Sequence, residues 1–181
     1  MKIVPDRKAL LEELPKGGWA VEVGTLRGDF AIDIWEIIKP TELILIDPWT
    51  DYQIYNGEVS YQLVKKILPE AHLYRGYSYD GVPTLNDKSL SFAYVDADHQ
   101  YEGCLNDLEL LYPKMKRGGW LCGHDYCAGC DFGVVRAVTV FCYRHNLEIS
   151  LMTDEPPGDW LGPVGNQPLK ISYNSYGIQI P

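Results

Sequence analysis

The sequence predicts an α/β fold, a doubly wound and mostly parallel sheet with helices on both faces. Apolar runs typical of strands alternate with amphipathic helical segments along most of the chain. The strand runs are apolar almost throughout, as expected for parallel strands that are buried on both faces. The 181 residues suffice for one domain with a full core. We expect a single domain over residues 1–181, with a short N-terminal helix in 1–18 and a C-terminal hairpin or tail in 155–181.

Six segments are predicted to form strands, because each is a short apolar run bounded by turn residues or by a helical pattern. They are residues 19–25, 42–49, 72–78, 90–97, 120–126 and 148–154. In open α/β sheets, ligands bind outside the carboxyl ends of the strands. Polar residues that follow these runs are therefore the first candidates for a functional site.

Helices are predicted between the strands. Asp6 is placed to cap a first short helix, which stops at Pro15. A helical stripe runs from Leu105 to Met115, and Pro113 is expected to kink or shorten that helix. The other predicted helices are residues 29–38, 58–68 and 133–146.

The composition argues against nucleic-acid and membrane partners. The formal net charge is −9 and there is no basic stripe, so binding to a phosphate backbone is not expected. No apolar run approaches the roughly 20 residues of a membrane span, and the first residues contain no apolar stretch of the signal-peptide type. We therefore expect a cytoplasmic protein. Five cysteines at irregular spacing predict reduced thiols rather than a disulfide framework.

A glycine turn follows the first predicted strand, in the stretch EVGTLRG at 22–28. Gly24 and Gly28 allow a tight turn and close approach of a ligand to the backbone. Asp47 ends the next strand, where an acidic side chain can accept both hydroxyls of a ribose. Together they favour an adenosine-bearing ligand over a plain turn beside a capped strand end. The G-x-G-x-x-G fingerprint is absent, which disfavours a nicotinamide-dependent oxidoreductase.

Ionisable residues gather after two further strands. Asp96, Asp98 and His99 follow one strand, and His124 with Asp125 ends the neighbouring one. Oxygen-rich ligation suits Mg²⁺, Ca²⁺ or Mn²⁺, and a histidine among the ligands favours Mn²⁺. His99 could accept a proton from a substrate hydroxyl. The alternative is structural, with Asp98 capping the following helix and His99 solvated in a loop.

The cysteines offer two competing interpretations. Cys122, His124, Cys127 and Cys130 have the right chemistry for zinc. However, structural zinc sites usually need two ligand pairs separated by a longer loop, and Cys122 would lie inside a buried strand. Cys127 and Cys130 could also form a redox pair, but they follow a fifth strand rather than opening the helix that such a motif requires.

Four stretches taken together resemble a known family. EVGTLRG, LIDPW, FAYVDADHQYEG and GGWLCGHDY, within residues 19–150, are similar to class I S-adenosylmethionine-dependent methyltransferases. The likeness is greatest to the small metal-assisted O-methyltransferases of the catechol, caffeoyl-CoA and bacterial sugar types. The resemblance implies a Rossmann-like sheet of seven strands with the last one antiparallel. It also implies methyl transfer to a small-molecule hydroxyl, on a sugar or an aromatic compound.

The resemblance also implies roles for matching positions. The cofactor-binding positions are Glu22, Gly24, Thr25, Gly28, Asp47, Ser78 and Asp98. The divalent-metal ligands, for Mg²⁺ or Mn²⁺, are Asp96, His124 and Asp125. The catalytic base position is His99.

Three features depart from the family pattern. Phe30 stands where several relatives have a serine that contacts the cofactor, and His124 stands where an acidic ligand is usual. The region before the first predicted strand is short, so the substrate site is either open or completed by a second copy in a homo-oligomer. A non-catalytic module that binds S-adenosylmethionine or a nucleotide is the alternative function.

Overall fold

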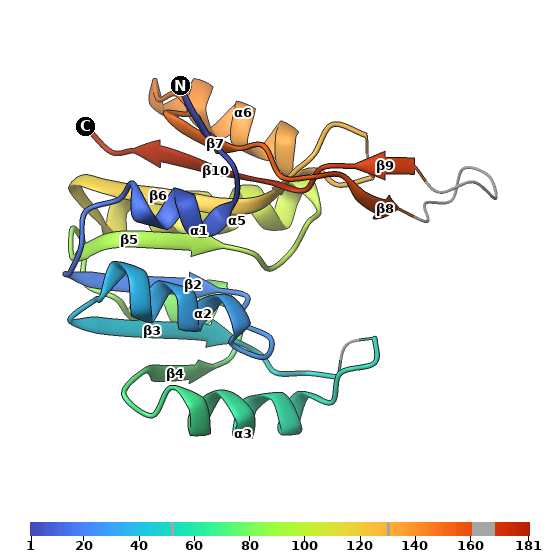
Figure 1. The fold of residues 1–181 in the computed structure, drawn as a ribbon. Helices are drawn as coiled ribbons and strands as arrows, with labels where there is room; N and C mark the ends of the chain where they lie inside the picture. The colour runs from blue at the N-terminus through green and yellow to red at the C-terminus, as the bar shows by residue number, and fades with distance from the viewer. Residues whose placement is uncertain (52, 130, 161–168) are drawn as a thin grey trace.

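The structure is a computed structural model that describes residues 1–51, 53–129, 131–160 and 169–181. Eight strands form one sheet in the order β1-β7-β10-β6-β5-β2-β3-β4 (Figure 1). Their bounds are β1 Lys2–Val4, β2 Trp19–Val23, β3 Glu42–Asp47, β4 His72–Arg75, β5 Leu90–Val95, β6 Met115–Tyr126, β7 Leu151–Thr153 and β10 Asn174–Gln179.

All neighbouring strands of this sheet are parallel except β10, which pairs antiparallel with β6 and β7. The α/β class and the antiparallel last strand are therefore confirmed. The sheet has eight strands rather than seven, because residues Lys2–Val4 pair in parallel with Leu151–Thr153 and add an edge strand. Three residues are too short a run to show strand periodicity in the sequence.

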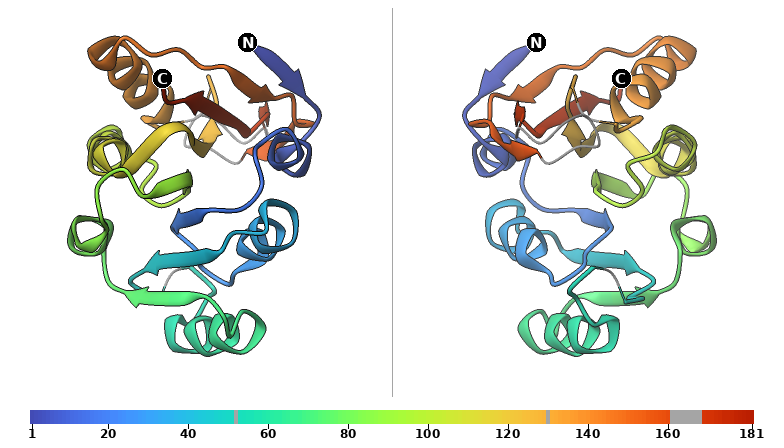
Figure 2. Two further views of the ribbon diagram at one scale, coloured as in Figure 1. Left: turned by 90° about the vertical axis from the view of Figure 1, so that its left-hand side faces the viewer. Right: turned by 90° about the vertical axis from the view of Figure 1, so that its right-hand side faces the viewer.

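Helices cover both faces of the sheet (Figure 2). The first two, α1 and α2, lie on one face, whereas α4, α5 and α6 lie on the other, and α3 lies beside β4. Their bounds are α1 Arg7–Glu12, α2 Asp29–Asp33, α3 Gly57–Ile67, α4 Ser78–Gly81, α5 Tyr101–Leu111 and α6 Val134–His145. A π-helical segment at Ile34–Ile38 extends α2, and short 3₁₀ turns at Val82–Thr84 and Tyr112–Lys114 follow α4 and α5.

Each face of the sheet has its own apolar cluster. On the α1–α2 face, Leu10, Ile34 and Leu43 are fully buried. On the α5–α6 face, Leu108 and Phe141 are fully buried. Burial on both faces explains why the strand sequences are apolar almost throughout.

Three predicted elements are wrong in their bounds. The helix predicted to include Met115 ends at Leu111, and Met115 begins β6, five residues earlier than the predicted strand. Pro113 lies in the 3₁₀ turn between them, where its missing N–H ends the α-helical hydrogen-bond pattern. The strand predicted over residues 72–78 ends at Arg75, so Ser78 is the first residue of α4 rather than a strand end.

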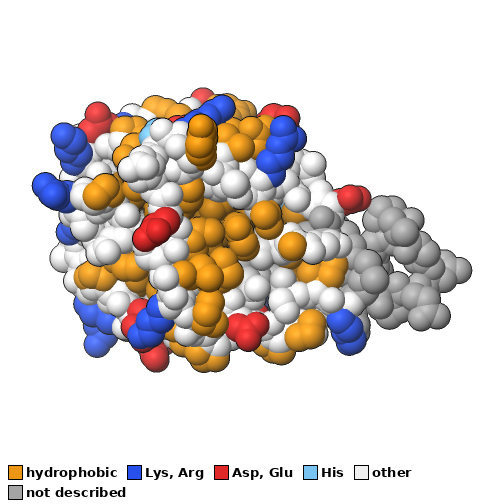
Figure 3. Space-filling view, turned by 90° about the horizontal axis from the view of Figure 1, so that it is seen from above, with side chains coloured by type: hydrophobic (Ala, Val, Ile, Leu, Met, Phe, Trp, Pro, Cys, Tyr) orange, Lys and Arg blue, Asp and Glu red, His pale blue; other side chains and the backbone are white. Residues whose placement is uncertain are grey.

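The tail contributes a separate two-stranded antiparallel pair, β8 (Gly158–Trp160) with β9 (Leu169–Ile171), at the carboxyl end of the sheet (Figure 1). At the edge of the main sheet that β1 forms, Met1 and Ile3 are exposed. Hydrophobic side chains gather on the face of the molecule that is seen from above (Figure 3). Throughout the described ranges, every helix falls short of the length and apolar character that a membrane crossing requires.

Candidate functional site

The glycine loop, residues 24–28, connects β2 to α2. Gly24 has a φ of +90°, and a Cβ added there would lie 2.1 Å from the carbonyl oxygen of Asp96. Gly28 has a φ of +82° and caps α2, with Val64 of α3 only 3.2 Å from a built Cβ. Both positions require glycine, because the left-handed backbone and the close neighbours exclude a side chain. The loop therefore lies directly against the end of β5.

Asp47, the last residue of β3, holds this loop in place. Its Oδ2 accepts hydrogen bonds from the backbone N–H groups of Thr25 (3.0 Å) and Leu26 (2.9 Å). Its Oδ1 accepts one from the N–H of Trp49 at 2.6 Å. A carboxylate offers about four acceptor positions, so little acceptor capacity remains for a ligand. The ribose contact stays a prediction, and Asp47 has a second role that the sequence did not reveal.

Glu22 and Thr25 are buried beside the loop with unsatisfied polar atoms. Glu22 is 2% exposed, and neither its Oε2 nor the hydroxyl of Thr25 has a hydrogen-bond partner within the described residues. Burial raises the pKa of Glu22 to about 8. Buried polar atoms without partners are uncommon in native proteins, and a ligand is one ordinary explanation. These unsatisfied polar atoms have the chemistry that the methionine end of S-adenosylmethionine requires.

The other two predicted cofactor positions are already bonded within the protein. The hydroxyl of Ser78 donates to the carboxylate of Asp107, a buried residue of α5. Asp98 is exposed, and its Oδ1 accepts from the N–H of Gln100 at 2.9 Å, just before α5. The N-cap of α5 is Gln100, and Asp98 bonds to the N–H of that residue rather than to one inside the helix, so the structural alternative, in which Asp98 caps the helix, is wrong. The predicted roles of both residues toward a cofactor stay predictions.

Asp96, His124 and Asp125 come together across the ends of β5 and β6. Their ligand atoms lie within 4.8 Å of one another, and they are the one such group among the residues the structure describes. Nδ1 of His124 lies 3.3 Å from Oδ1 of Asp125 and 3.9 Å from Oδ1 of Asp96. Asp125 has a φ of +56°, a conformation that aspartate tolerates better than most residues. Two carboxylates and an imidazole are a suitable donor set for a divalent cation such as Mn²⁺.

His99 completes this group, which we call the acid–imidazole cluster (Asp96, His99, His124 and Asp125). Its Nε2 lies 3.0 Å from Oδ2 of Asp125 and 3.9 Å from Oδ1 of Asp96, and its ring packs 4.6 Å from that of Phe132. His99 is thus held in the cluster and is not a solvated loop residue.

Charges within the cluster are strongly coupled. The hydrogen bond to Asp125, with a contribution from Asp96, raises the pKa of His99 to about 10. Burial opposes the charged forms of His124 and Asp125, but the pairing of each with its oppositely charged neighbours outweighs burial. This pairing raises the pKa of His124 and lowers the pKa of Asp125. An imidazole can accept a proton only in its neutral form. His99 therefore fits the base role only when a cation or a substrate replaces it as the partner of Asp125.

The two cysteine interpretations, a zinc site and a redox pair, are tested only at the described cysteines. Cys122 is a buried free thiol in the apolar cluster that includes Phe92 and Tyr94, and burial raises its pKa, as expected for a packed cysteine. Cys127 is disulfide-bonded, contrary to the expected reduced thiol. Cys130, which both the zinc and the redox interpretations require, lies outside the described residues.

Two residues near the site were missed by sequence reasoning. Arg7 of α1 has its guanidinium 3.9 Å from Asp96 and 4.6 Å above the ring of Phe30. Asp107 accepts the Ser78 hydroxyl from inside α5. Asp107 could have been found from the sequence, because it is an acidic residue among the leucines of a predicted helix. No sequence signal was available for Arg7, because its placement depends on how α1 crosses the sheet.

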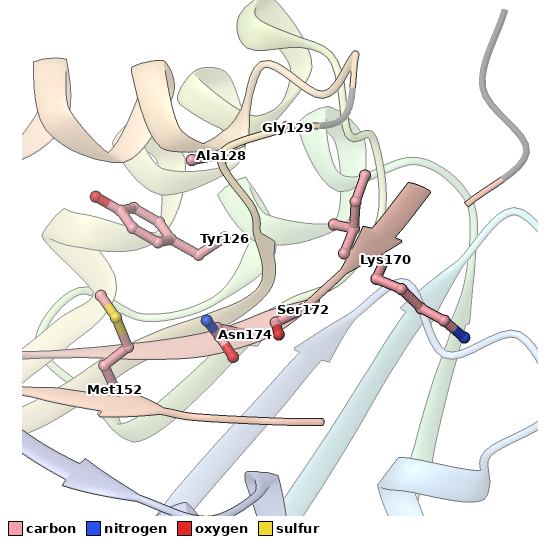
Figure 4. Close-up of a pocket in the computed structure, with 8 residues that line it drawn as sticks. Tyr126, Ala128, Gly129, Met152, Lys170, Ser172 and Asn174 are labelled. Carbon is pink, nitrogen blue, oxygen red and sulfur yellow. The ribbon is translucent and has the colours of Figure 1, made fainter. Parts of the chain in front are cut away.

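A cavity of about 440 Å³ lies between the end of β6 and the strands β7 and β9 (Figure 4). Tyr126 and Met152 lie at one end of it and Lys170 at the other. Its lining residues are Tyr126, Ala128, Gly129, Met152, Lys170, Ile171, Ser172 and Asn174. A second cavity, about 660 Å³, includes Arg117 and Gln179 at the opposite edge of the sheet. No residue of the glycine loop lines either of these two cavities.

Comparison with known proteins identifies the domain type. The family described as a methyltransferase domain matches residues 21–126, more than half of the 181 residues. An uncharacterized protein of Acanthamoeba polyphaga mimivirus is 29% identical over 114 residues, which cover 59% of this chain and 50% of the mimivirus protein. The chain thus spans about half the length of the curated relative that it matches.

Solved structures share the fold at low sequence identity. Geranyl diphosphate methyltransferase in complex with S-adenosylmethionine superposes with a TM-score of 0.64 at 8% identity, covering 94% of this chain and 81% of that one. An S-adenosylmethionine-dependent O-methyltransferase from Thermotoga maritima gives 0.62 at 9% identity, with 94% and 62% covered. A tRNA methyltransferase from Aquifex aeolicus gives 0.61 at 14% identity, with 95% and 66% covered.

Proposed function

Because the chain belongs to the family of methyltransferase domains, whose cofactor is S-adenosylmethionine, we propose that it methylates a hydroxyl oxygen of a small molecule with the help of a divalent cation. One observation carries the proposal. The glycine loop and the acid–imidazole cluster share a wall, since Gly24 approaches the backbone of Asp96 too closely for any side chain. The N–H of Asp96 also donates to the carbonyl of Val23 at 2.8 Å, directly before the loop.

The first half of the site supports cofactor binding. Bound S-adenosylmethionine would supply an activated methyl group, so the protein mainly needs to align it with an acceptor. Glu22 and Thr25 have the unsatisfied buried atoms that the methionine end would use. Asp47 keeps Thr25 and Leu26 in the shape that allows this approach.

The second half supports activation of a hydroxyl. Asp96, His124 and Asp125 would hold a divalent cation, which lowers the pKa of a hydroxyl bound to it. His99 would accept the hydroxyl proton at Nε2, the nitrogen that now lies 3.0 Å from Asp125. The remaining contact of His99, with the ring of Phe132, would keep the imidazole in place during that exchange.

A small acceptor fits the chain better than RNA. The net charge of −9 opposes binding of a phosphate backbone, although one structural neighbour acts on tRNA. The cavity that Tyr126 lines combines apolar Met152 and Ile171 with polar Ser172 and Asn174. Such a lining suits a sugar or an aromatic ring that carries hydroxyl groups.

A non-catalytic binding module is the second candidate. It is favoured by one observation, the pairing of His99 with Asp125, which holds the proposed base in its protonated form. In that case the cluster would only stabilise the end of β6, and cofactor binding would occur without turnover.

The experiment is a methyl-transfer assay with S-adenosylmethionine labelled in its methyl group. The purified protein is incubated with panels of catechols, other phenols and sugars, in Mg²⁺, in Mn²⁺ and in EDTA. We expect transfer to oxygen in at least one panel, loss of transfer in EDTA and recovery when the cation is restored. The control is His145→Ala, which removes an imidazole paired with Glu109 on the helical face, 2.7 Å from its partner.

Three results would decide against the proposal. Transfer that is indifferent to EDTA excludes the cation. Transfer to nitrogen or to RNA excludes the hydroxyl acceptor. Binding of S-adenosylhomocysteine without transfer to any compound favours the binding module.

A further inference from the structure

The first helix delivers a positive charge to the site. Asp6 caps α1 by accepting a hydrogen bond from the N–H of Ala9 at 2.8 Å. Leu10 and Leu11, on the buried side of the helix, are fully inaccessible to solvent and anchor it on the sheet. Arg7, the first residue of the helix, is thereby directed toward the end of β5.

The guanidinium of Arg7 contacts an aromatic ring and a carboxylate but makes no hydrogen bond to a described residue. Its Cζ lies 4.6 Å from the centre of the Phe30 ring, a cation–π contact. Its nearest charged partner is Asp96, at 3.9 Å, beyond ordinary hydrogen-bond distance. No hydrogen bond of this guanidinium to any described residue is present. Arginine offers five N–H donors, so the side chain has donors available for a ligand.

A second observation points to the same ligand from the other side. Glu22 is buried, and its unpartnered Oε2 lies where the charge of Arg7 acts on it, lowering its pKa against the larger opposing effect of burial. Glu22 precedes the glycine loop, and Arg7 lies beside Asp96, whose backbone Gly24 of that loop contacts. The Glu22 carboxylate can accept hydrogen bonds from an ammonium group, and the Arg7 guanidinium can donate hydrogen bonds to a carboxylate. That pairing is complementary to the zwitterion of an α-amino acid.

We propose that Arg7 binds the α-carboxylate of the methionine part of S-adenosylmethionine. This inference rests on the proposed function and adds a residue that lies outside the matched family region, 21–126. The competing explanation is structural, with Arg7 only balancing the charge of Asp96. The two explanations differ in one expectation. Only if Arg7 binds the carboxylate does the affinity lost on replacing Arg7 depend on whether the ligand carries that carboxylate.

The test compares two ligands that differ in that group alone. S-adenosylhomocysteine carries the α-amino and α-carboxylate groups, whereas its decarboxylated analogue keeps the amine and lacks the carboxylate. Dissociation constants of both are measured by calorimetry for the wild type, Arg7→Gln and Arg7→Lys. Lys8→Gln is the matched control, because Lys8 is the next residue of α1 and its Nζ pairs with Asp33 at 2.9 Å, away from the loop.

In the wild type we expect S-adenosylhomocysteine to bind about 10- to 100-fold more tightly than the decarboxylated analogue, the usual effect of a charge-assisted hydrogen bond. In Arg7→Gln the two ligands should bind equally, because only the first loses affinity. Arg7→Lys should give an intermediate ratio, and Lys8→Gln should keep the wild-type ratio. The ratio within one variant cancels any general loss of folded protein.

Two outcomes overturn the inference while leaving the proposed function intact. Either Arg7→Gln weakens both ligands by the same factor, or it leaves the wild-type ratio unchanged. If the wild type binds neither compound, the proposed function itself fails, and this inference fails with it.

Discussion

On the glycine-loop side of the carboxyl edge, the carboxylate of Asp47 bonds to the protein's own backbone, whereas in the acid–imidazole cluster the side chains bond to one another. Asp47 accepts three backbone N–H groups. Asp125 instead faces the imidazoles of His99 and His124. Backbone contacts set the shape of the loop before any ligand arrives. The side-chain pairs of the cluster must rearrange when a cation or a substrate enters.

This difference predicts two kinds of response to substitution. Changes in the cluster should affect turnover, because its groups act on the reacting atoms. Changes around the glycine loop should affect cofactor affinity and protein stability.

The largest expected effect is that of His99→Ala. Removal of the proton acceptor should lower kcat by about 10²- to 10⁴-fold, the usual contribution of a general base, while the Kd of S-adenosylhomocysteine stays within a few-fold of the wild type. Turnover is measured by the methyl-transfer assay and affinity by calorimetry. An equal loss of turnover and of affinity would reassign His99 to ligand binding. It would also remove the contrast between the glycine loop and the acid–imidazole cluster.

Glu22→Gln tests the one unsatisfied carboxyl on the loop side. The pKa of Glu22 is raised from 4.5 to about 8, so the folded protein keeps this proton while the unfolded chain releases it. Wild-type stability should therefore fall as the pH rises from 4.5 to 8. Relative to Glu22→Gln, the ligand-free wild type should lose on the order of 2–4 kcal/mol over that interval. Urea unfolding at pH 5 and pH 8 measures it, and parallel curves for the two proteins would contradict the burial argument.

Asp47→Asn tests the backbone contacts that shape the loop. An asparagine keeps one acceptor oxygen and loses the charge and the second oxygen, so the N–H groups of Thr25 and Leu26 or that of Trp49 lose their partner. We expect the Kd of S-adenosylhomocysteine to rise about 10- to 100-fold, the usual cost of one or two hydrogen bonds to a charged group. Asp87→Asn, which changes a surface carboxylate paired with Lys114, is the control. Unchanged affinity in Asp47→Asn would separate the loop from the cofactor site.

Ser78→Ala should have the smallest effect. The hydroxyl of Ser78 donates to Asp107, whose pKa burial raises to about 6, and this hydrogen bond partly opposes the rise. We expect a loss of about 1 kcal/mol in stability, typical of one hydrogen bond, and only a few-fold weaker binding of S-adenosylhomocysteine. Ser89→Ala removes a hydroxyl that bonds to the carbonyl of Asn86 and serves as the control. A loss of more than tenfold in affinity would place Ser78 itself against the ligand.

The features that the sequence predicted correctly depend on local patterns. The apolar runs that became β2, β3 and β5 carry their own signal, and parallel pairing then brings their carboxyl ends to one edge. For that reason Asp96 could be expected near His124, although 28 positions separate them in the chain. The resemblance to methyltransferases could be read from the same stretches.

The features that were missed depend on long-range packing. The edge strand β1 exists because Lys2–Val4 finds β7 near the other end of the chain. Arg7 reaches Asp96 because buried leucines fix the direction of α1. The carboxylate of Asp47 turns toward the loop because Trp49 and Leu26 present their N–H groups to it. None of these contacts leaves a periodic signal in the sequence.

The most direct test of the central claim, that one edge of the sheet holds both a cofactor site and a cation site, is anomalous diffraction from crystals grown with S-adenosylhomocysteine and Mn²⁺. We predict one manganese peak among Asp96, His124 and Asp125, with the ligand against the glycine loop and its carboxylate at Arg7. Bound S-adenosylhomocysteine with no manganese peak at these three residues would contradict the account.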